Sequence, residues 1–446
     1  MKRTLLPLLC SAALAAAAQP QPLVVHEWGT FTSLQDEAGR TLGGINSDDE
    51  PVPGFVHGMN SFLIVPNRET PVFSKGVARS RPDVTMRLET PVVYFHPPKD
   101  ASLPLTVDLK VSFRGGLLAE FFPLAEMADV KDYNKITPET VGSLAWNRLK
   151  IGTDGAGPKT TERVWLAPRA VKAASVTSTN SESEKFLFYR GVGNLNSPLQ
   201  TRRSADGTSL TLHSQLSRDV AALGPMKIRK LWLASFNAEG KCAFRALPEV
   251  TLGGNGGAEL LKTPASFAPG EYSKGALPQL RQQMHAALLE DGMFTDEADA
   301  LLNTWELSYF KSGGLRLFFT VPRAWTDFHL PLEVSVPSEI KRAMIGRIEL
   351  VTPAQRSLMS ELARAVIPRV PHTENGITYT NFVPSATVKA AYQDLGRFRS
   401  ALLLNELALR PTESLKTLAQ VNRLNGLTLA PPVPATGQPA RSTVFE

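Results

Sequence analysis

The sequence contains very little cysteine: Cys10 and Cys242 are the only two among its 446 residues. Cys10 lies in a short apolar segment at the N-terminus that we expect to be removed, which leaves Cys242 as the only thiol. A mature chain with one thiol cannot form an intramolecular disulfide. The fold must therefore be stabilised by burial of apolar surface, which a chain of this length can provide over two domains.

Long apolar runs are also absent, because no segment approaches the roughly 20 apolar residues that a membrane-spanning helix needs. The N-terminal segment instead begins with Lys2 and Arg3, continues with an apolar stretch over residues 4–14, and ends in small residues over 15–18. This order is typical of a bacterial export signal. We expect residues 1–18 to be a cleaved signal peptide and the mature protein, starting near Gln19, to be soluble and either periplasmic or extracellular.

Charge of one sign is not concentrated anywhere in the chain. The formal net charge is +6, and 48 Lys and Arg residues are scattered among 42 Asp and Glu residues. Proteins that bind nucleic acids usually gather basic residues in a patch or stripe along the phosphates. The sequence therefore predicts no nucleic-acid partner, and together with export it favours an extracytoplasmic glycan or a protein as the partner.

The first half of the chain shows the period-two pattern of β-strands. In LTVDLKVSF, residues 105–113, the apolar residues from Leu105 to Phe113 alternate with polar ones. Similar short runs recur as far as residue 252, separated by Pro, Gly, Asn and Ser. Many short strands with little helical periodicity between them favour a β-rich, antiparallel, sandwich-like domain over residues 19–252.

After GGNGG, residues 253–257, the periodicity changes. Two segments with helical spacing, over 277–288 and 295–312, predict a helical hairpin with Thr295 as its second N-cap. Strands return over 315–351, followed by a capping box at Thr352, a hairpin signal at 374–377, and helices over 386–409 and 412–424. The predicted fold class is α+β.

Two domain layouts fit this pattern. In the first, an α+β domain with several helices spans 258–428 and is separate from the N-terminal domain. In the second, the strands over 315–351 complete the first domain's sheet and the helices pack on it. In both, residues 429–446 contain too little apolar sequence to fold and form a disordered tail.

The stretch VVHEWGTFTS, residues 24–33, places a His directly before a Glu, which suggests the zinc-binding helix motif H-E-x-x-H. The fourth position of that motif is Thr30 here, and the β-branched and aromatic residues favour a strand. On a strand, His26, Trp28 and Thr30 share one face, while Glu27 points to the other. The sequence therefore predicts a first strand in which His26 and Glu27 do not act as a pair.

The loop GGINSDDEPVPGFVH, residues 43–57, crowds the acids Asp48, Asp49 and Glu50 between Gly and Pro residues. Oxygen ligands of this kind suit a hard cation such as calcium, although the spacing differs from that of an EF-hand. The alternative is a solvated acidic turn. No metal is assigned from the sequence.

The other candidates for a binding site are the histidines of the first hundred residues and one arginine at the end of an apolar strand. His26, His57 and His96 can converge with acids to bind zinc or iron, or they can be isolated histidines. Arg190 ends an apolar strand, where a cation usually has a carboxylate or a ligand as its partner. We predict one ligand-binding pocket made of His26, Asp48, Asp49, Glu50, His57 and Arg190.

Several stretches together resemble a family of exported bacterial proteins whose mature chain opens with a HEWGTFT-like sequence. The resemblance covers about residues 24–353 and implies export and one continuous architecture; it implies no activity, cofactor or catalytic residue. The stretches that carry it are VVHEWGTFTS, GGINSDDEPVP, ETPVVYF, GGLLAEFFP, EKFLFYRGVG, NTWELSYF, LRLFFTVP, LPLEVSVP and GRIELVTP.

Two classes of function remain open at this point. The first is a non-catalytic binding or envelope-associated protein, favoured because the sequence contains no recognisable catalytic motif. The second is a secreted hydrolase, metal-dependent or not, that acts on an extracytoplasmic polymer such as a glycan. Its basis is the crowding of His and acidic residues near the mature N-terminus.

Overall fold

The computed structural model describes most of the chain between residues 21 and 425, and it has 36% strand and 26% helix, which confirms the α+β fold class. The described residues are 21–47, 52–59, 73–74, 77–128, 133, 135–237, 239–253, 259–374 and 377–425. The predicted signal peptide, the acids Asp48 to Glu50 and the predicted tail lie outside them. In the described part of the chain, no helix is long and apolar enough to cross a membrane.

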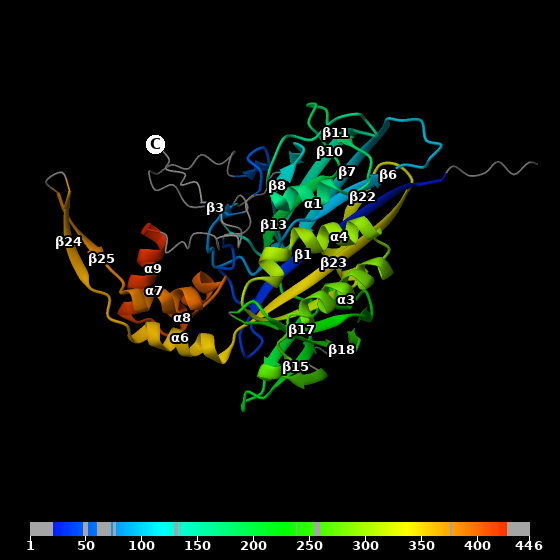
Figure 1. Ribbon diagram of the computed structural model, residues 1–446. Helices are drawn as coiled ribbons and strands as arrows, with labels where there is room; N and C mark the ends of the chain where they lie inside the picture. The colour runs from blue at the N-terminus through cyan, green and yellow to red at the C-terminus, as the bar shows by residue number, and fades with distance from the viewer. Residues whose placement is uncertain are drawn as a thin grey trace, which may run out of the picture.

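A large mixed sheet forms the body of the protein (Figure 1). Its strands are β1 (Leu23–Gln35), β2 (His57–Gly58), β5 (Met86–Leu88), β6 (Val92–His96), β7 (Leu105–Arg114), β8 (Gly116–Phe122), β9 (Glu126–Met127), β10 (Val141–Ile151), β11 (Val176–Thr177), β12 (Ser183–Glu184), β13 (Leu187–Gly193), β17 (Leu231–Phe236), β18 (Cys242–Leu247), β21 (Gly314–Thr320), β22 (Leu332–Val334) and β23 (Ser338–Leu350).

Smaller sheets and the helices complete the fold. The small sheets pair β3 (Phe73–Ser74) with β4 (Val77–Ala78), β14 (Leu199–Arg203) with β15 (Ser209–Ser214) and β20 (Glu259–Pro264), β16 (Met226–Ile228) with β19 (Val250–Leu252), and β24 (Arg369–Glu374) with β25 (Ile377–Phe382). The helices are α1 (Arg163–Arg169), α2 (Arg218–Ala221), η2 (Pro269–Glu271), α3 (Ala276–Glu290), α4 (Thr295–Thr304), η3 (Glu306–Phe310), α5 (Arg323–His329), α6 (Pro353–Arg364), α7 (Ala386–Asp394), α8 (Arg399–Leu409) and α9 (Glu413–Asn425).

Strand β1 is central to the sheet, and the prediction that VVHEWGTFTS forms the first strand is confirmed. It pairs in parallel with β23 along its whole length, from Leu23 opposite Ser338 to Gln35 opposite Leu350. Its other edge pairs antiparallel with β5 and β6. Side chains point alternately to the two faces in parallel and antiparallel strands alike, so this alternation does not reveal the parallel pair.

The sheet contains strands from both sides of the expected boundary at residues 253–257. Strands β17 and β18 precede this point, while β21 and β23 follow it, and the order across the sheet is β1-β23-β21-β17-β18. The strands over 315–351 therefore complete the sheet of β1, as in the second layout. A Gly-rich stretch in a sequence predicts a flexible connection, but it does not determine which of the strands before and after it pair with each other.

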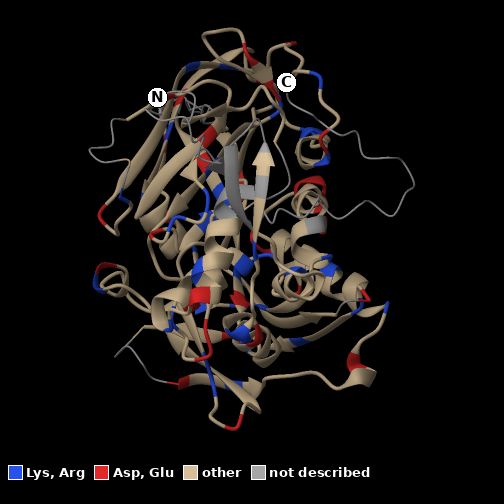
Figure 2. Cartoon of the chain, turned by 90° about the vertical axis from the view of Figure 1, so that its left-hand side faces the viewer, with Lys and Arg blue, Asp and Glu red and all other residues tan. Residues whose placement is uncertain are grey.

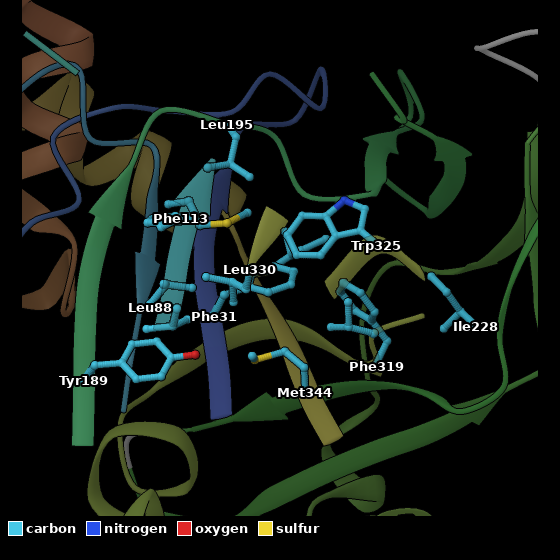
Figure 3. Packing of buried hydrophobic residues seen from close by; sticks show 14 of the residues in the cluster. Phe31, Leu88, Phe113, Tyr189, Leu195, Ile228, Phe319, Trp325, Leu330 and Met344 are labelled. Atoms are coloured by element: carbon cyan, nitrogen blue, oxygen red, sulfur yellow. The ribbon is translucent and has the colours of Figure 1, made fainter. Parts of the chain in front are cut away.

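Both faces of β1 are buried, each against a different core. Phe31 packs among Trp325, Phe319 and Met344 on one face (Figure 3). Trp28 belongs to the other face, where the sheet meets α3 and α4. The predicted division of the strand into two faces is confirmed by this arrangement.

The predicted helical hairpin is present as α3 and α4, which lie across β1 and β23 in Figure 1. The N-cap of α4 is Phe294 rather than the expected Thr295. The backbone N–H of Phe294 is instead satisfied by the side chain of Glu297, three residues further on. A Glu at this position can take over one half of a capping box, so no Ser or Thr is required.

Helices α6 to α9 pack beside one end of the sheet and share a core with residues that follow β1. The capping box at the start of α6 is confirmed, because the Thr352 side chain accepts from the N–H of Gln355 at 3.3 Å. The single helix expected over 386–409 is wrong: it is divided into α7 and α8. Gly396 lies between them with a φ of +86°, a left-handed conformation that ends a helix.

Candidate metal centre

The pairing of β1 with β6 brings two histidines onto one face of the sheet. His26 lies opposite Tyr94 and Val24 lies opposite His96, so the two histidines are diagonal neighbours on adjacent antiparallel strands. Side chains two positions apart on a strand share a face. The ring centroids of His26 and His96 are 5.0 Å apart.

A carboxylate from helix α4 joins the two imidazoles. His26 Nδ1 lies 2.7 Å from Glu297 Oε2, and His96 Nε2 lies 2.9 Å from Glu297 Oε1. The backbone N–H of Phe294 also donates to Glu297 Oε2, at 2.8 Å. Glu297 therefore accepts from two strands and from the start of its own helix, which fixes the carboxylate beneath both rings.

This cluster of His26, His96 and Glu297, called the His–Glu–His cluster below, is shielded from solvent. The side chains of His26 and Glu297 are 1% and 0% exposed, and that of His96 is 15% exposed. The ring of Phe294 lies 4.6 Å from the His26 ring and 4.9 Å from the His96 ring, although Phe294 itself is 46% exposed. Phe294 therefore packs against both imidazoles while part of the residue remains exposed to solvent.

The carboxyl group of Glu297 stays ionised at every physiological pH. Burial by itself raises the pKa of this group, but the hydrogen bonds from His26 and His96 and that from the Phe294 N–H outweigh it. The pKa of Glu297 is lowered to about 2. An anionic carboxylate with two imidazoles is a donor set that zinc and several transition metals bind.

The donor atoms of the three residues, one from each, all lie within 4.8 Å of one another. A tetrahedral zinc ion with bonds of about 2.1 Å holds its donors about 3.4 Å apart. Around an ion, the hydrogen-bonded separations of 2.7 and 2.9 Å would widen by about 0.5–0.7 Å. Donor atoms near the 4.8 Å limit would have to move closer by about 1 Å or more, so the side chains must rearrange to bind an ion.

Other residues of the predicted pocket are found in separate arrangements. His57 Nε2 lies 2.8 Å from Glu182 Oε1, and Arg190 forms an ion pair with Glu120 across β13 and β8. Of the two kinds of partner considered for Arg190, a carboxylate or a ligand, the structure shows a carboxylate. Within the part of the chain that the structure describes, the His–Glu–His cluster contains His26 but neither His57 nor Arg190.

Glu27, on the opposite face of β1, has partners of a different kind. Its carboxylate forms an ion pair with Arg342 of β23, its register neighbour, and accepts from the hydroxyl of Tyr189. Arg342 also contacts Asp327 at 2.9 Å. The prediction that His26 and Glu27 do not act as a pair is confirmed, because each residue belongs to a separate network.

Sequence analysis did not identify Glu297 as a candidate site residue. It lies 271 positions from His26 and 201 from His96, so no local spacing connects the three residues. The sequence contains only an indirect indication of this contact. His26 and His96 lie on strands, and an acid in the first turn of a helix can face them. Only the packing of α4 on β1 and β6 turns this into a site.

Cavities and surface charge do not add to this cluster. Two surface cavities of about 480 and 320 Å³ are lined by other residues, among them Trp146 for the first and Arg342 for the second. In Figure 2, Lys and Arg residues are interspersed with Asp and Glu residues over the molecule. Neither of these two cavities is lined by a residue of the His–Glu–His cluster.

The solved structures similar to this chain include two mu-homology domains, both distant. No protein-family model and no curated protein matches the chain. The Fcho1 mu homology domain of Danio rerio, solved with a bound Eps15 peptide, is 10% identical over 75% of this chain and 100% of its own, with a TM-score of 0.27. The yeast delta-COP mu-homology domain, complexed with a Dsl1 WxWxV peptide, is 9% identical over 75% of this chain and 98% of its own, with a TM-score of 0.25.

Proposed function

We propose that this is an exported metal-binding protein in which His26, His96 and Glu297 hold a divalent ion of the zinc type. One observation carries the proposal: two imidazole nitrogens and a carboxylate, from two strands and a helix, meet within 4.8 Å in a shielded position. Buried charged groups are costly unless they are paired or coordinate a metal. In this cluster a metal ion would replace the hydrogen bonds that join His26 and His96 to Glu297.

The donor set favours a transition-metal ion over calcium. Calcium takes six to eight oxygen ligands. The His–Glu–His cluster offers two nitrogens and one carboxylate, a set found with zinc, iron and related ions. The calcium site considered for the acidic loop at residues 48–50 is a separate hypothesis, and those residues lie outside the described part of the chain.

Burial of the cluster supports a binding role ahead of a catalytic one. A catalytic zinc site has three protein ligands and an open position for water and substrate, whereas a structural site is closed by four. The cluster supplies three ligands, so its burial and not its ligand count is what favours a binding role. Here His26 and Glu297 are almost fully buried, and both oxygens of Glu297 face the cluster. Two histidines and a glutamate are also the ligands of zinc hydrolases, so a metal-dependent hydrolase acting on an extracytoplasmic polymer is the second candidate.

Export is part of the same proposal. It is supported by the signal-like segment over residues 1–18 and by the resemblance to exported bacterial proteins. Imidazole and carboxylate sites can be loaded outside the cytoplasm without a thiol that would oxidise there. The N-terminus of protein recovered from the periplasm or medium should lie near Gln19; an intact Met1 would contradict export.

Metal binding is tested on the full chain, stripped of metal with a chelator and titrated with Zn²⁺ by isothermal calorimetry. We expect one ion per chain, with an affinity that falls at least about 100-fold in His96→Ala, which removes a nitrogen donor, and in Glu297→Gln, which replaces an anionic oxygen donor by a neutral amide. His285→Ala is the matched control, since His285 pairs with Asp299 on the same helical hairpin, outside the cluster. A wild-type chain that binds no Zn²⁺ with micromolar or better affinity contradicts the proposal.

A further inference from the structure

We infer that Phe294 is a gate over the His–Glu–His cluster, whose ring controls how fast ions enter and leave. The inference rests on the proposed metal-binding function. It starts from an unusual residue at a helix N-terminus. Phe294 is the N-cap of α4, a position where Ser, Thr, Asp and Asn are strongly preferred because their side chains accept from backbone N–H groups.

The Phe294 side chain makes no capping hydrogen bond, and the residue is 46% exposed. An exposed aromatic ring at an N-cap gives the helix nothing that a small polar residue would not give better. Its ring instead contacts both imidazoles, at 4.6 and 4.9 Å between centroids. The position of the ring is therefore explained by the cluster and not by the helix.

The gate is attached directly to a ligand of the cluster. The backbone N–H of Phe294 donates to Glu297 Oε2, the same oxygen that lies 2.7 Å from His26 Nδ1. The backbone of Phe294 is thus fixed while its side chain can rotate, because exposed side chains change rotamer without unfolding the helix. Rotation of the ring away from His96, the more exposed histidine, would open the cluster to solvent.

This geometry predicts slow exchange of a tightly held ion. With the ring in place, water and chelators can approach the ion only along the exposed part of His96, and outward rotation of the Phe294 side chain widens this access. Removal of the ring should leave the three donor atoms unchanged, so it should affect the rate of ion release more than the number of ions bound. Loss of two aromatic contacts corresponds to at least about fivefold faster release.

The test measures Zn²⁺ release from the loaded full chain to an excess of a coloured chelator, by stopped-flow absorbance. Phe294→Ala and Phe294→Ser both remove the ring, but Ser supplies a good N-cap and Ala does not. If the ring is the gate, both variants release Zn²⁺ at least about fivefold faster than wild type. Leu223→Ala is the control, because Leu223 is also an exposed apolar residue, 54% exposed, in a distant turn.

Three outcomes overturn the inference, and they can be told apart. If only Phe294→Ala is faster, fraying of α4 explains the effect and the ring is not a gate. If neither variant differs from wild type by more than about twofold, the ring does not control exchange although the metal site exists. If wild type carries no Zn²⁺, the gate fails together with the proposed function.

Discussion

Two carboxylates are buried against opposite faces of strand β1, and they differ in the groups that hold them. Glu297 is held by the imidazoles of His26 and His96, whereas Glu27 is held by the guanidinium of Arg342 and the hydroxyl of Tyr189. Burial alone would lower the pKa of Arg342, but Glu27 and its neighbours outweigh this and raise it above its usual value. Arg342 thus keeps its positive charge at all accessible pH values.

On one face of β1, Glu27 is held in a fixed ion pair with Arg342. On the other face, Glu297 is held by two histidines, which can exchange a proton for a metal ion. A guanidinium cannot lose its proton in a protein, so the Glu27 network is locked once it is formed. An imidazole can lose its proton and then bind a metal through the same nitrogen. One face of β1 therefore holds a permanent connection between strands, and the other holds groups that can bind an ion.

The largest expected effect comes from breaking the fixed pair. Arg342→Met leaves Glu27 buried without its cation, and we expect a loss of about 3–5 kcal/mol in the free energy of unfolding, measured by urea denaturation. The double variant with Glu27→Gln should recover part of this loss, because the uncompensated charge is gone. A single variant as stable as wild type would show that the pair is not important to the fold.

Acid should protonate Glu297 and remove its contribution to stability within a defined pH range. The pKa of Glu297 is lowered from 4.5 to about 2, so its contribution to stability is fully present above about pH 4.5 and is lost as pH falls through about 2. The shift corresponds to about 3 kcal/mol. Urea denaturation of the metal-free protein at a series of pH values checks this. Glu297→Gln should lose less stability over this range; equal slopes would contradict the assignment.

The smallest effect is expected where a histidine and an acid meet at the surface. His57 and Glu182 have side chains 27% and 25% exposed, so solvent screens their pair. We expect His57→Ala to cost about 0.5 kcal/mol in thermal or urea denaturation, which is typical of a partly exposed pair. A loss above about 2 kcal/mol would show that this pair resembles the buried His–Glu–His cluster.

Local patterns predicted much of this structure. The β-branched and aromatic residues of VVHEWGTFTS identified β1, and the alternation along it separated His26 from Glu27. Thr352 and Gln355 identified the start of α6. These predictions succeeded because each depends on residues within one turn or one strand. The break at Gly396 was missed because helical spacing continues on both sides of it.

The sequence by itself determined that this chain is rich in short strands. It also determined that His26 lies on the first strand and points to the face opposite to that of Glu27. Only the tertiary structure decided that β1 pairs in parallel with β23, more than 300 positions away, and that Glu297 reaches His26 and His96. The physical reason is that alternation fixes which face of a strand a side chain occupies. What covers that face depends on the packing of the whole chain.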